Sequence, residues 1–245
     1  MSSIRKLKDG LSGADIYTDG NLVYKTANNS DSAYKWFSYV QNYLNIPKIS
    51  KVVANTITME YIRHDKTYLN LHTHKALNLI QDQLEKMSKL DVIENGYIFN
   101  DYVKRIEMHV KLAKDIPEFA NTFQKLKEIK LKPTFSHGDF GVRNMLFKGD
   151  QLYLIDPNLD TFGCTKLDVA KFIASLYTGQ SPIESKFHEY NSIAYLASRL
   201  LCDYNNFEKD ILATLIKSEI IRVYKYHPNK QFILNKVQQV EADFL

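Results

Sequence analysis

The hydrophobic pattern of the chain changes near residue 61, and this change constrains the fold more than any other feature. Before it, apolar residues form short, strand-like runs. After it, they recur at the three- and four-residue spacing of long helices. No Gly/Ser-rich linker marks the change, and 245 residues can bury a large core. We therefore predict an α+β fold with two lobes, a small β-rich lobe over 1–61 and a larger helical lobe over 62–245.

Local signals place the individual elements. Asp19-Gly20-Asn21 predicts a hairpin turn between strands at 16–17 and 22–25. A helix is expected over 33–44, stopped by Pro47, and two strands over 51–62. The later helices are expected over 69–90, 100–114, 118–129, 166–177, 186–203, 207–226 and 231–244. Residues 133–160 break this pattern with loops and short strands.

Charge and cysteine content exclude several classes of function. The 32 Lys and Arg residues and 28 Asp and Glu residues are spread along the chain, without the clustered basic surface that nucleic-acid binding needs. Two cysteines, Cys164 and Cys202, fit a reducing compartment and supply no zinc-type spacing. Residues 1–10 lack the apolar core of a signal peptide, and no apolar run reaches bilayer length. We predict a cytoplasmic protein that binds neither nucleic acid nor membranes.

Glycine is scarce and unevenly distributed. The chain has nine glycines in 245 residues, about half of the usual share of roughly 7%. Seven of them lie in or beside two irregular segments: Gly10, Gly13, Gly20, Gly138, Gly141, Gly149 and Gly163. Because glycine is used where the backbone needs unusual freedom or close approach, these segments are the candidate functional loops.

The second irregular segment carries the residue types that phosphoryl transfer needs. Residues 137–144 read HGDFGVRN, and a short apolar strand at 152–155 then leads to Asp156. Asp139 would orient the attacking hydroxyl and take its proton, while Asn144 and Asp156 would supply hard oxygen ligands for Mg²⁺. We expect this pattern to form the catalytic site.

These residues resemble those of the aminoglycoside phosphotransferase and choline kinase superfamily, which are small-molecule kinases with a protein-kinase-like fold. Members carry an H-G-D-x-x-x-x-N catalytic loop and a later I-D metal-binding motif, both present here. The segments Asp156-Pro157-Asn158 and 166–171 (KLDVAK) also resemble members linked to bacterial surface-carbohydrate pathways.

The resemblance extends to a nucleotide site in the first lobe. Residues 10–17 (GLSGADIY) are similar to the loop that covers the nucleotide, so Gly10, Ser12 and Gly13 would lie near its phosphates. By the same resemblance, Lys25 would pair with the α and β phosphates of ATP. Backbone groups of Glu60, Tyr61 and Ile62 would meet the adenine.

Two departures from the family pattern stand out. Residues 30–44 contain no glutamate to pair with Lys25; Asp31 could substitute, and the loss keeps a non-catalytic, nucleotide-binding pseudokinase open as an alternative. Arg143, where many members have a small or neutral residue, is expected to reach the transferred phosphate as a catalytic residue.

Other polar residues are assigned structural roles. We expect His137 to hold the loop by hydrogen bonds, and Asp168 to brace it from the start of a helix. His72 and His74 do not share a helix face, so a solvent-exposed pair is favoured over a metal site.

We predict an ATP- and Mg²⁺-dependent kinase that phosphorylates a hydroxyl of a sugar, amino alcohol or related polar metabolite, with bacterial surface-carbohydrate metabolism as a candidate context. An antibiotic phosphotransferase of the aminoglycoside type is the alternative enzyme. The last seventy residues have only scattered acids, whereas a polycationic drug favours an acidic pocket.

Overall fold

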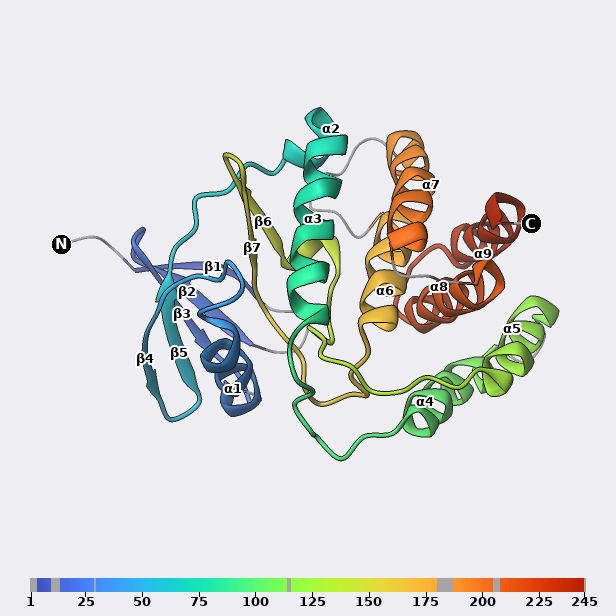
Figure 1. Ribbon diagram of the computed structural model, residues 1–245, viewed down its shortest axis with the longest axis horizontal. Coiled ribbons are helices and arrows are strands. Elements are labelled where there is room, and N and C mark those ends of the chain that lie inside the picture. Colours follow the sequence, from blue (N-terminus) through green and yellow to red (C-terminus); the bar gives the residue numbers. More distant parts are fainter. Residues whose placement is uncertain are drawn as a thin grey trace.

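The protein is a β-sheet joined to a larger group of helices, with a two-stranded hairpin between them (Figure 1). The computed structural model describes residues 4–9, 14–28, 30–113, 116–179, 187–204 and 208–244. A cluster of buried apolar side chains runs from α1 through α3 and α6 to α9, so the two parts share a core. The predicted α+β, two-lobed kinase-like fold is confirmed; the exact division at residue 61 stays a prediction.

The N-terminal sheet has five antiparallel strands in the order β1-β2-β3-β5-β4. They are β1 (Arg5–Asp9), β2 (Asp15–Thr18), β3 (Leu22–Thr26), β4 (Ile49–Val53) and β5 (Thr56–Glu60). The predicted hairpin forms because the Asp19 carboxylate accepts the amides of Asn21 and Leu22, both at 2.8 Å, and Gly20 takes a positive φ of 96°. Sequence reasoning did not assign β1, whose charged residues suit an exposed sheet edge.

Helix α1 (Ser30–Val40) follows the third strand and buries Trp36, Phe37 and Val40. It ends four residues before the predicted limit, and Pro47 is not what stops it. The amides of Tyr43 and Leu44 both bond to the Val40 carbonyl, at 2.8 and 2.9 Å, which closes the helix in a turn.

The helical part contains α2 (Tyr68–Leu71), α3 (Thr73–Ser88), α4 (Phe99–Lys111), α5 (Pro117–Glu128), α6 (Thr165–Tyr177), α7 (Phe187–Tyr204), α8 (Lys209–Tyr224) and α9 (Lys230–Phe244). The single helix predicted over 69–90 is in fact two, because the His72 backbone (φ −132°, ψ 46°) leaves the helical region. The other predicted helices are observed with small shifts at their ends.

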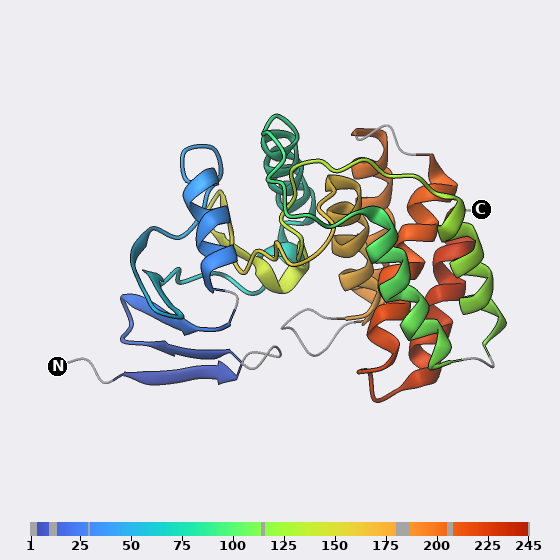
Figure 2. The same cartoon turned by 90° about the horizontal axis from the view of Figure 1, so that it is seen from below.

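Helices α6 and α8 form the centre of this part, and α4, α5 and α9 pack against α8 (Figure 2). Residues 212–221 of α8 are all buried, including Lys217 and Glu219. A helix that is covered on all sides brings polar groups inside only where partners satisfy them.

The hairpin of β6 (Met145–Lys148) and β7 (Gln151–Leu154) follows a short 3₁₀ turn, η1 (Val142–Asn144). The amide of Leu154 donates to the Asn45 carbonyl and that of Ile155 to Asn144, both at 3.0 Å. The second of these bonds places Asp156 next to the end of the 137–144 segment.

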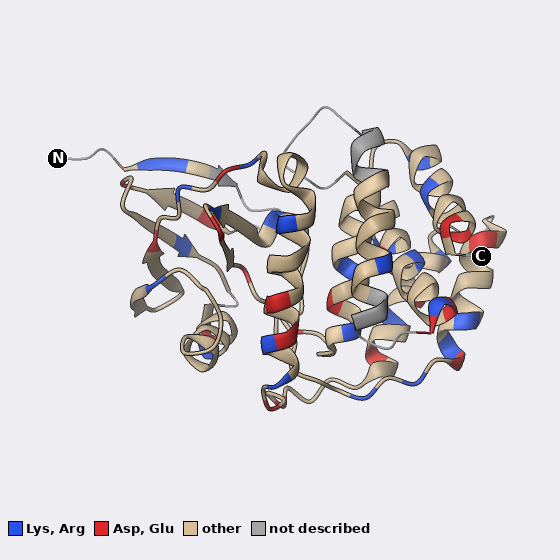
Figure 3. Cartoon of the chain, turned by 45° about the horizontal axis from the view of Figure 1, so that its top comes forward, with Lys and Arg blue, Asp and Glu red and all other residues tan. Residues whose placement is uncertain are grey.

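Lys and Arg residues occur along the sheet and the helices alike (Figure 3). Among the described helices, none combines the length and apolar character needed to cross a bilayer.

Candidate active site

The segment 137–144 adopts a backbone path that depends on Gly138. This residue has φ +75°. A Cβ built on it would lie 1.8 Å from the carbonyl oxygen of Asn158. Since real Cβ atoms do not approach that closely, only glycine fits this close crossing of two chain segments.

Helix α6 holds this segment through two side chains one turn apart. The Asp168 carboxylate accepts the amides of His137 at 2.6 Å and Gly138 at 2.9 Å. Lys171 donates to the Gly138 carbonyl at 2.6 Å, and its Nζ lies 3.3 Å from Asp139 Oδ1. The predicted bracing role of Asp168 is therefore observed.

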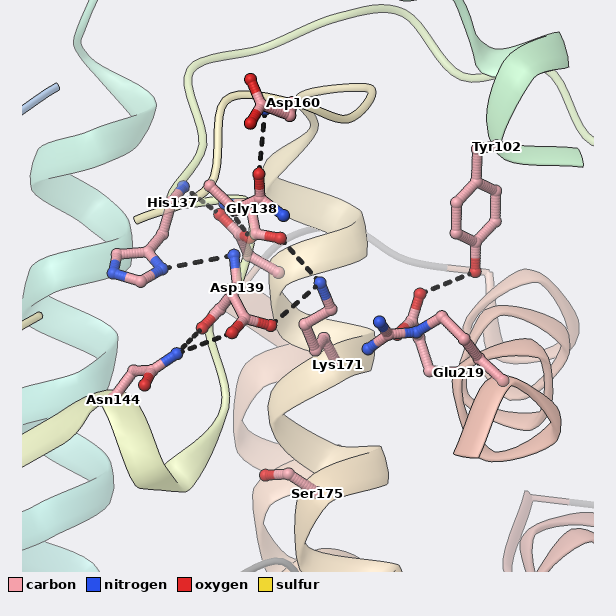
Figure 4. A network of polar contacts seen from close by, with 12 residues as sticks. Tyr102, His137, Gly138, Asp139, Asn144, Asp160, Lys171, Ser175 and Glu219 are labelled. Carbon is pink, nitrogen blue, oxygen red and sulfur yellow. Dashed lines mark hydrogen bonds and ion pairs between the residues drawn. The ribbon is translucent and has the colours of Figure 1, made fainter. Parts of the chain in front are cut away.

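Asp139 is partly exposed and faces two partners (Figure 4). Asn144 Nδ2 donates to the backbone carbonyl oxygen of Asp139, at 2.7 Å, and to Asp139 Oδ2, at 2.9 Å. Burial works against ionisation, but Lys171 and Arg222, with His137 and Asn144, outweigh it and hold the pKa of Asp139 below its ordinary value. Asp139 is therefore a carboxylate at neutral pH that can accept a hydrogen bond from a hydroxyl.

His137, the first residue of the segment, is completely buried. Its Nδ1 accepts the Asp139 amide at 3.3 Å. Burial lowers the pKa of His137 to about 4, so the ring is neutral. Trp36 of α1 packs edge-on against it with a centroid distance of 5.1 Å and donates Nε1–H to the Ser136 carbonyl at 2.9 Å. These contacts agree with the structural role expected for His137.

The predicted Mg²⁺ ligands have oxygen atoms available for a metal. Because the Nδ2 of Asn144 points at two acceptors, its Oδ1 faces away from them, toward no partner in the described chain. Asp156 is partly exposed and has φ +58°, a left-handed conformation that costs about 1 kcal/mol or more and is typical of functional positions. One amide oxygen and one carboxylate suit Mg²⁺, which commonly takes its other ligands from phosphates and water.

Lys25 of β3 is buried and forms an ion pair with Asp156, not with Asp31, which is exposed on α1. The structure therefore gives Lys25 a carboxylate partner, but this partner is Asp156, a predicted metal ligand, and not a residue of a helix. Gly10, Ser12 and Gly13, predicted to cover the phosphates, lie outside the described residues; β1 and β2 flank them.

The segment expected to meet adenine begins at Glu60, the last residue of β5. The amide of Glu60 donates to the Lys48 carbonyl at 2.9 Å and that of Tyr61 to the Asn21 carbonyl at 2.8 Å. These two amides are therefore already used. Ile62 has the one amide of the three for which the described residues provide no partner.

Arg143 lies in η1 between Asp139 and Asn144 in sequence. Its side chain is exposed and makes no hydrogen bond or ion pair with any residue in the described ranges. Its predicted contact with a transferred phosphate stays a prediction.

His72 lies between α2 and α3, and His74 lies in the first turn of α3. His72 stacks on the Tyr68 ring, with centroids 4.9 Å apart. No group of three or more His, Cys, Asp or Glu side chains in the described parts of the chain is arranged to hold a metal.

Sequence reasoning missed the polar residues that surround Asp139 on the helical side. Lys171 was part of a recognised sequence segment but had no role, and Tyr102, Glu219 and Arg222 had none either. Tyr102 donates to Glu219 Oε1 at 2.9 Å, and Arg222 Nε donates to Glu219 Oε2 at 2.9 Å. A Glu followed three residues later by Arg in a predicted helix rich in apolar residues was the one available signal.

Comparisons with known proteins place the fold. No protein-family model and no curated protein sequence matches the chain. Among solved structures, it is similar to a choline/ethanolamine kinase family protein from Mesorhizobium loti, with a TM-score of 0.67 and 12% identity, covering 98% of this chain and 87% of that one. It is also similar to a putative fructosamine-3-kinase from Thermobifida fusca, with a TM-score of 0.60 and 12% identity, covering 98% of this chain and 93% of that one. A third similar structure is ADP-bound aminoglycoside phosphotransferase APH(2'')-Ib, with a TM-score of 0.58 and 14% identity, covering 98% of this chain and 92% of that one. At these identities the likeness establishes a shared fold, which is the fold that the motifs predicted.

Proposed function

We propose that the protein is an ATP- and Mg²⁺-dependent kinase that phosphorylates a hydroxyl of a small polar molecule. The observation that carries this proposal is the convergence of four side chains from distant positions. Asp139 and Asn144 are hydrogen-bonded to each other, Asp156 lies beside them through the Ile155–Asn144 backbone bond, and Lys25 reaches Asp156 from the sheet. Solved structures of similar fold include kinases of choline or ethanolamine, fructosamine and aminoglycosides.

In the proposed reaction, the acceptor hydroxyl oxygen attacks the γ-phosphorus of ATP. The bond from that phosphorus to the β–γ bridging oxygen breaks, ADP leaves with the electron pair, and the hydroxyl proton passes to the Asp139 carboxylate. Asp139, with its lowered pKa, is a weak base that mainly orients the hydroxyl. This suits a loose transition state, in which the proton leaves late.

The other residues supply positioning and charge. Asn144 and Asp156 would hold Mg²⁺, which, when bound, neutralises charge on the phosphate oxygens. Lys25 would contact the α and β phosphates, and the amide of Ile62 would donate to the adenine. Gly10, Ser12 and Gly13 would cover the phosphates, and Arg143 would approach the transferred phosphoryl group.

The decisive test is Asp139→Ala assayed for ATP consumption with and without Mg²⁺ over sugars and amino alcohols. We expect turnover to fall by about 10²-fold or more, while ATP affinity stays within about twofold because Asp139 does not hold the nucleotide. Turnover that survives in this variant would refute the assignment. In the same assay, Arg143→Ala should lower turnover more than ATP binding, and equal losses would count against its catalytic role.

A nucleotide-binding pseudokinase is the second candidate, because no carboxylate of α1 pairs with Lys25 in the part of the chain that the structure describes. It predicts ATP binding by the wild-type chain without phosphoryl transfer to any acceptor. Transfer to even one acceptor eliminates it.

A further inference from the structure

A pocket opens beside the catalytic segment, on the side facing the helices. Gly138 lines it together with Asp168 and Lys171 of α6. The remaining polar lining residues are Tyr102 and Arg105 of α4, Glu219 and Arg222 of α8, and Thr161. Figure 4 shows Tyr102 and Glu219 across from Asp139, with Lys171 between them. An acceptor molecule with its hydroxyl at Asp139 would extend into this pocket.

Both acids in the pocket wall are already satisfied by protein donors. Each Asp168 oxygen accepts one backbone amide, from His137 or Gly138. Each Glu219 oxygen accepts one side-chain donor, from Tyr102 or Arg222. Glu219 is 3% exposed. Neither acid is therefore left as an open partner for a positively charged ligand.

The arginines of the pocket have donors to spare. Arg222 uses Nε for Glu219, and its two terminal nitrogens bond to no described residue. Arg105 is exposed, and its guanidinium makes no hydrogen bond or ion pair within the described chain. A guanidinium presents up to five N–H donors in a planar fork that matches a carboxylate or phosphate.

Arg222 is also close enough to influence the catalytic carboxylate. Its charge contributes to the lowered pKa of Asp139, and Asp139 in turn helps to raise the pKa of Arg222, after the larger effect of Glu219. Arg222 also lines the same pocket as Lys171, whose Nζ lies 3.3 Å from Asp139 Oδ1.

We infer that the acceptor carries an anionic group, a carboxylate or a phosphate, which binds between Arg105 and Arg222 while its hydroxyl faces Asp139. This inference rests on the proposed kinase function and narrows its substrate class. A cationic acceptor would meet two guanidinium groups with unused donors and, among the described residues that line the pocket, no unpaired acid. The geometry therefore disfavours aminoglycosides and amino alcohols, which stood among the sequence-based candidates.

The first experiment measures anion binding directly. The full chain is saturated with Mg²⁺ and a non-hydrolysable ATP analogue, so that the nucleotide site is filled, and then titrated with inorganic phosphate by calorimetry. We expect one phosphate to bind, with an affinity that weakens as salt rises. Absence of phosphate binding by the nucleotide-loaded protein overturns the inference.

Two variants assign the bound phosphate to this pocket. Arg105→Gln should weaken phosphate binding about fivefold, since this side chain is exposed. The double variant Glu219→Gln/Arg222→Gln leaves no buried charge unpaired and keeps the net charge, so it should still fold; it should weaken binding about tenfold or more. Lys104→Gln, an exposed cation on the same helix that does not line the pocket, is the charge-matched control and should bind normally. Equal binding by all four proteins overturns the inference.

The second experiment uses four hexoses that differ in charge. Glucosamine, glucose, glucuronate and glucose 6-phosphate are compared as acceptors with Mg²⁺ and ATP. Preference for either anionic sugar supports the inference and tells carboxylate from phosphate; preference for glucosamine overturns it while leaving the kinase function intact. If no hexose reacts, the phosphate titration decides. Failure of the protein to bind the ATP analogue would instead refute the proposed function.

Discussion

Segment 137–144 and the proposed nucleotide side of the site around Lys25 are held in different ways. Segment 137–144 is held from two helices, by hydrogen bonds with Asp168 and Lys171 of α6 and by the ring contact of Trp36 of α1 with His137. Lys25, in contrast, meets the rest of the site through its ion pair with the partly exposed Asp156. The acceptor side is thus built into the core, whereas the nucleotide side depends on a contact that Mg²⁺ and phosphates would have to rearrange. Substitutions on the two sides should therefore differ in their effects on stability.

The largest effect is expected from Gly138→Ala. The new Cβ would overlap the Asn158 carbonyl at a φ that disfavours alanine. We therefore expect the free energy of unfolding, measured by chemical denaturation, to fall by about 3 kcal/mol or more, and turnover to be lost as well. Gly149→Ala, at φ +55° with open space around it, should cost only about 1 kcal/mol; similar losses in both would show that crowding at Asn158 is unimportant.

Asp168→Asn should have the next largest effect and lower the free energy of unfolding by about 2 kcal/mol. Asparagine has one side-chain oxygen, whereas the amides of His137 and Gly138 each bond to a separate oxygen of Asp168. Burial raises the pKa of Asp168 to about 7, although the His137 amide, Lys171 and the Gly138 amide each lower it. Asp210→Asn, an exposed acid in the first turn of α8, is the matched control and should change stability by less than about 0.5 kcal/mol. A wild-type-like Asp168→Asn protein would contradict the bracing role.

His137 should make stability depend on pH. Its pKa is about 4 in the folded protein and about 6.5 in an unfolded chain. Below pH 6.5 the unfolded state therefore binds a proton that the folded state refuses, and stability falls as the pH drops from about 6.5 to 4, by up to about 3 kcal/mol. Asp168 has the opposite effect on the pH dependence of stability. Because its pKa is raised in the folded protein, its contribution to the free energy of unfolding falls as the pH rises from about 4 to 7.

The difference between wild type and His137→Asn isolates the histidine. Asparagine can still accept the Asp139 amide but does not titrate. Denaturation curves between pH 4 and 7 should show the wild-type free energy rising with pH relative to that of the variant. Parallel curves would mean that His137 is not kept neutral.

The smallest effect on stability is expected from Lys25→Met. An ion pair whose acid is 41% exposed contributes at most about 1 kcal/mol, so unfolding should hardly change. ATP affinity, in contrast, should fall by about tenfold, because the phosphates lose a cation. Lys48→Met, an exposed lysine before β4, should change neither. A large loss of stability in Lys25→Met would erase the contrast between the two sides.

Much of the fold could be predicted because its signals are local. The Asp19-Gly20-Asn21 turn bonds within itself, and the spacing of apolar residues identifies each long helix. The predictions were wrong or incomplete where contacts with other parts of the chain determine an element or its end. The charged strand β1 is stabilised by pairing with β2, and α1 ends through a turn at Val40 rather than at Pro47.

By itself, the sequence determined the two-part fold and the positions of Asp139, Asn144 and Asp156, because period and motif spacing are properties of neighbouring residues. Only the tertiary structure decided what surrounds them. The partner of Lys25 lies 131 residues away, and Arg222 reaches the pocket because α8 packs between α4 and α6. Such contacts are set by how helices and sheet pack together, which no local pattern encodes, and they determine the charge that an acceptor would meet.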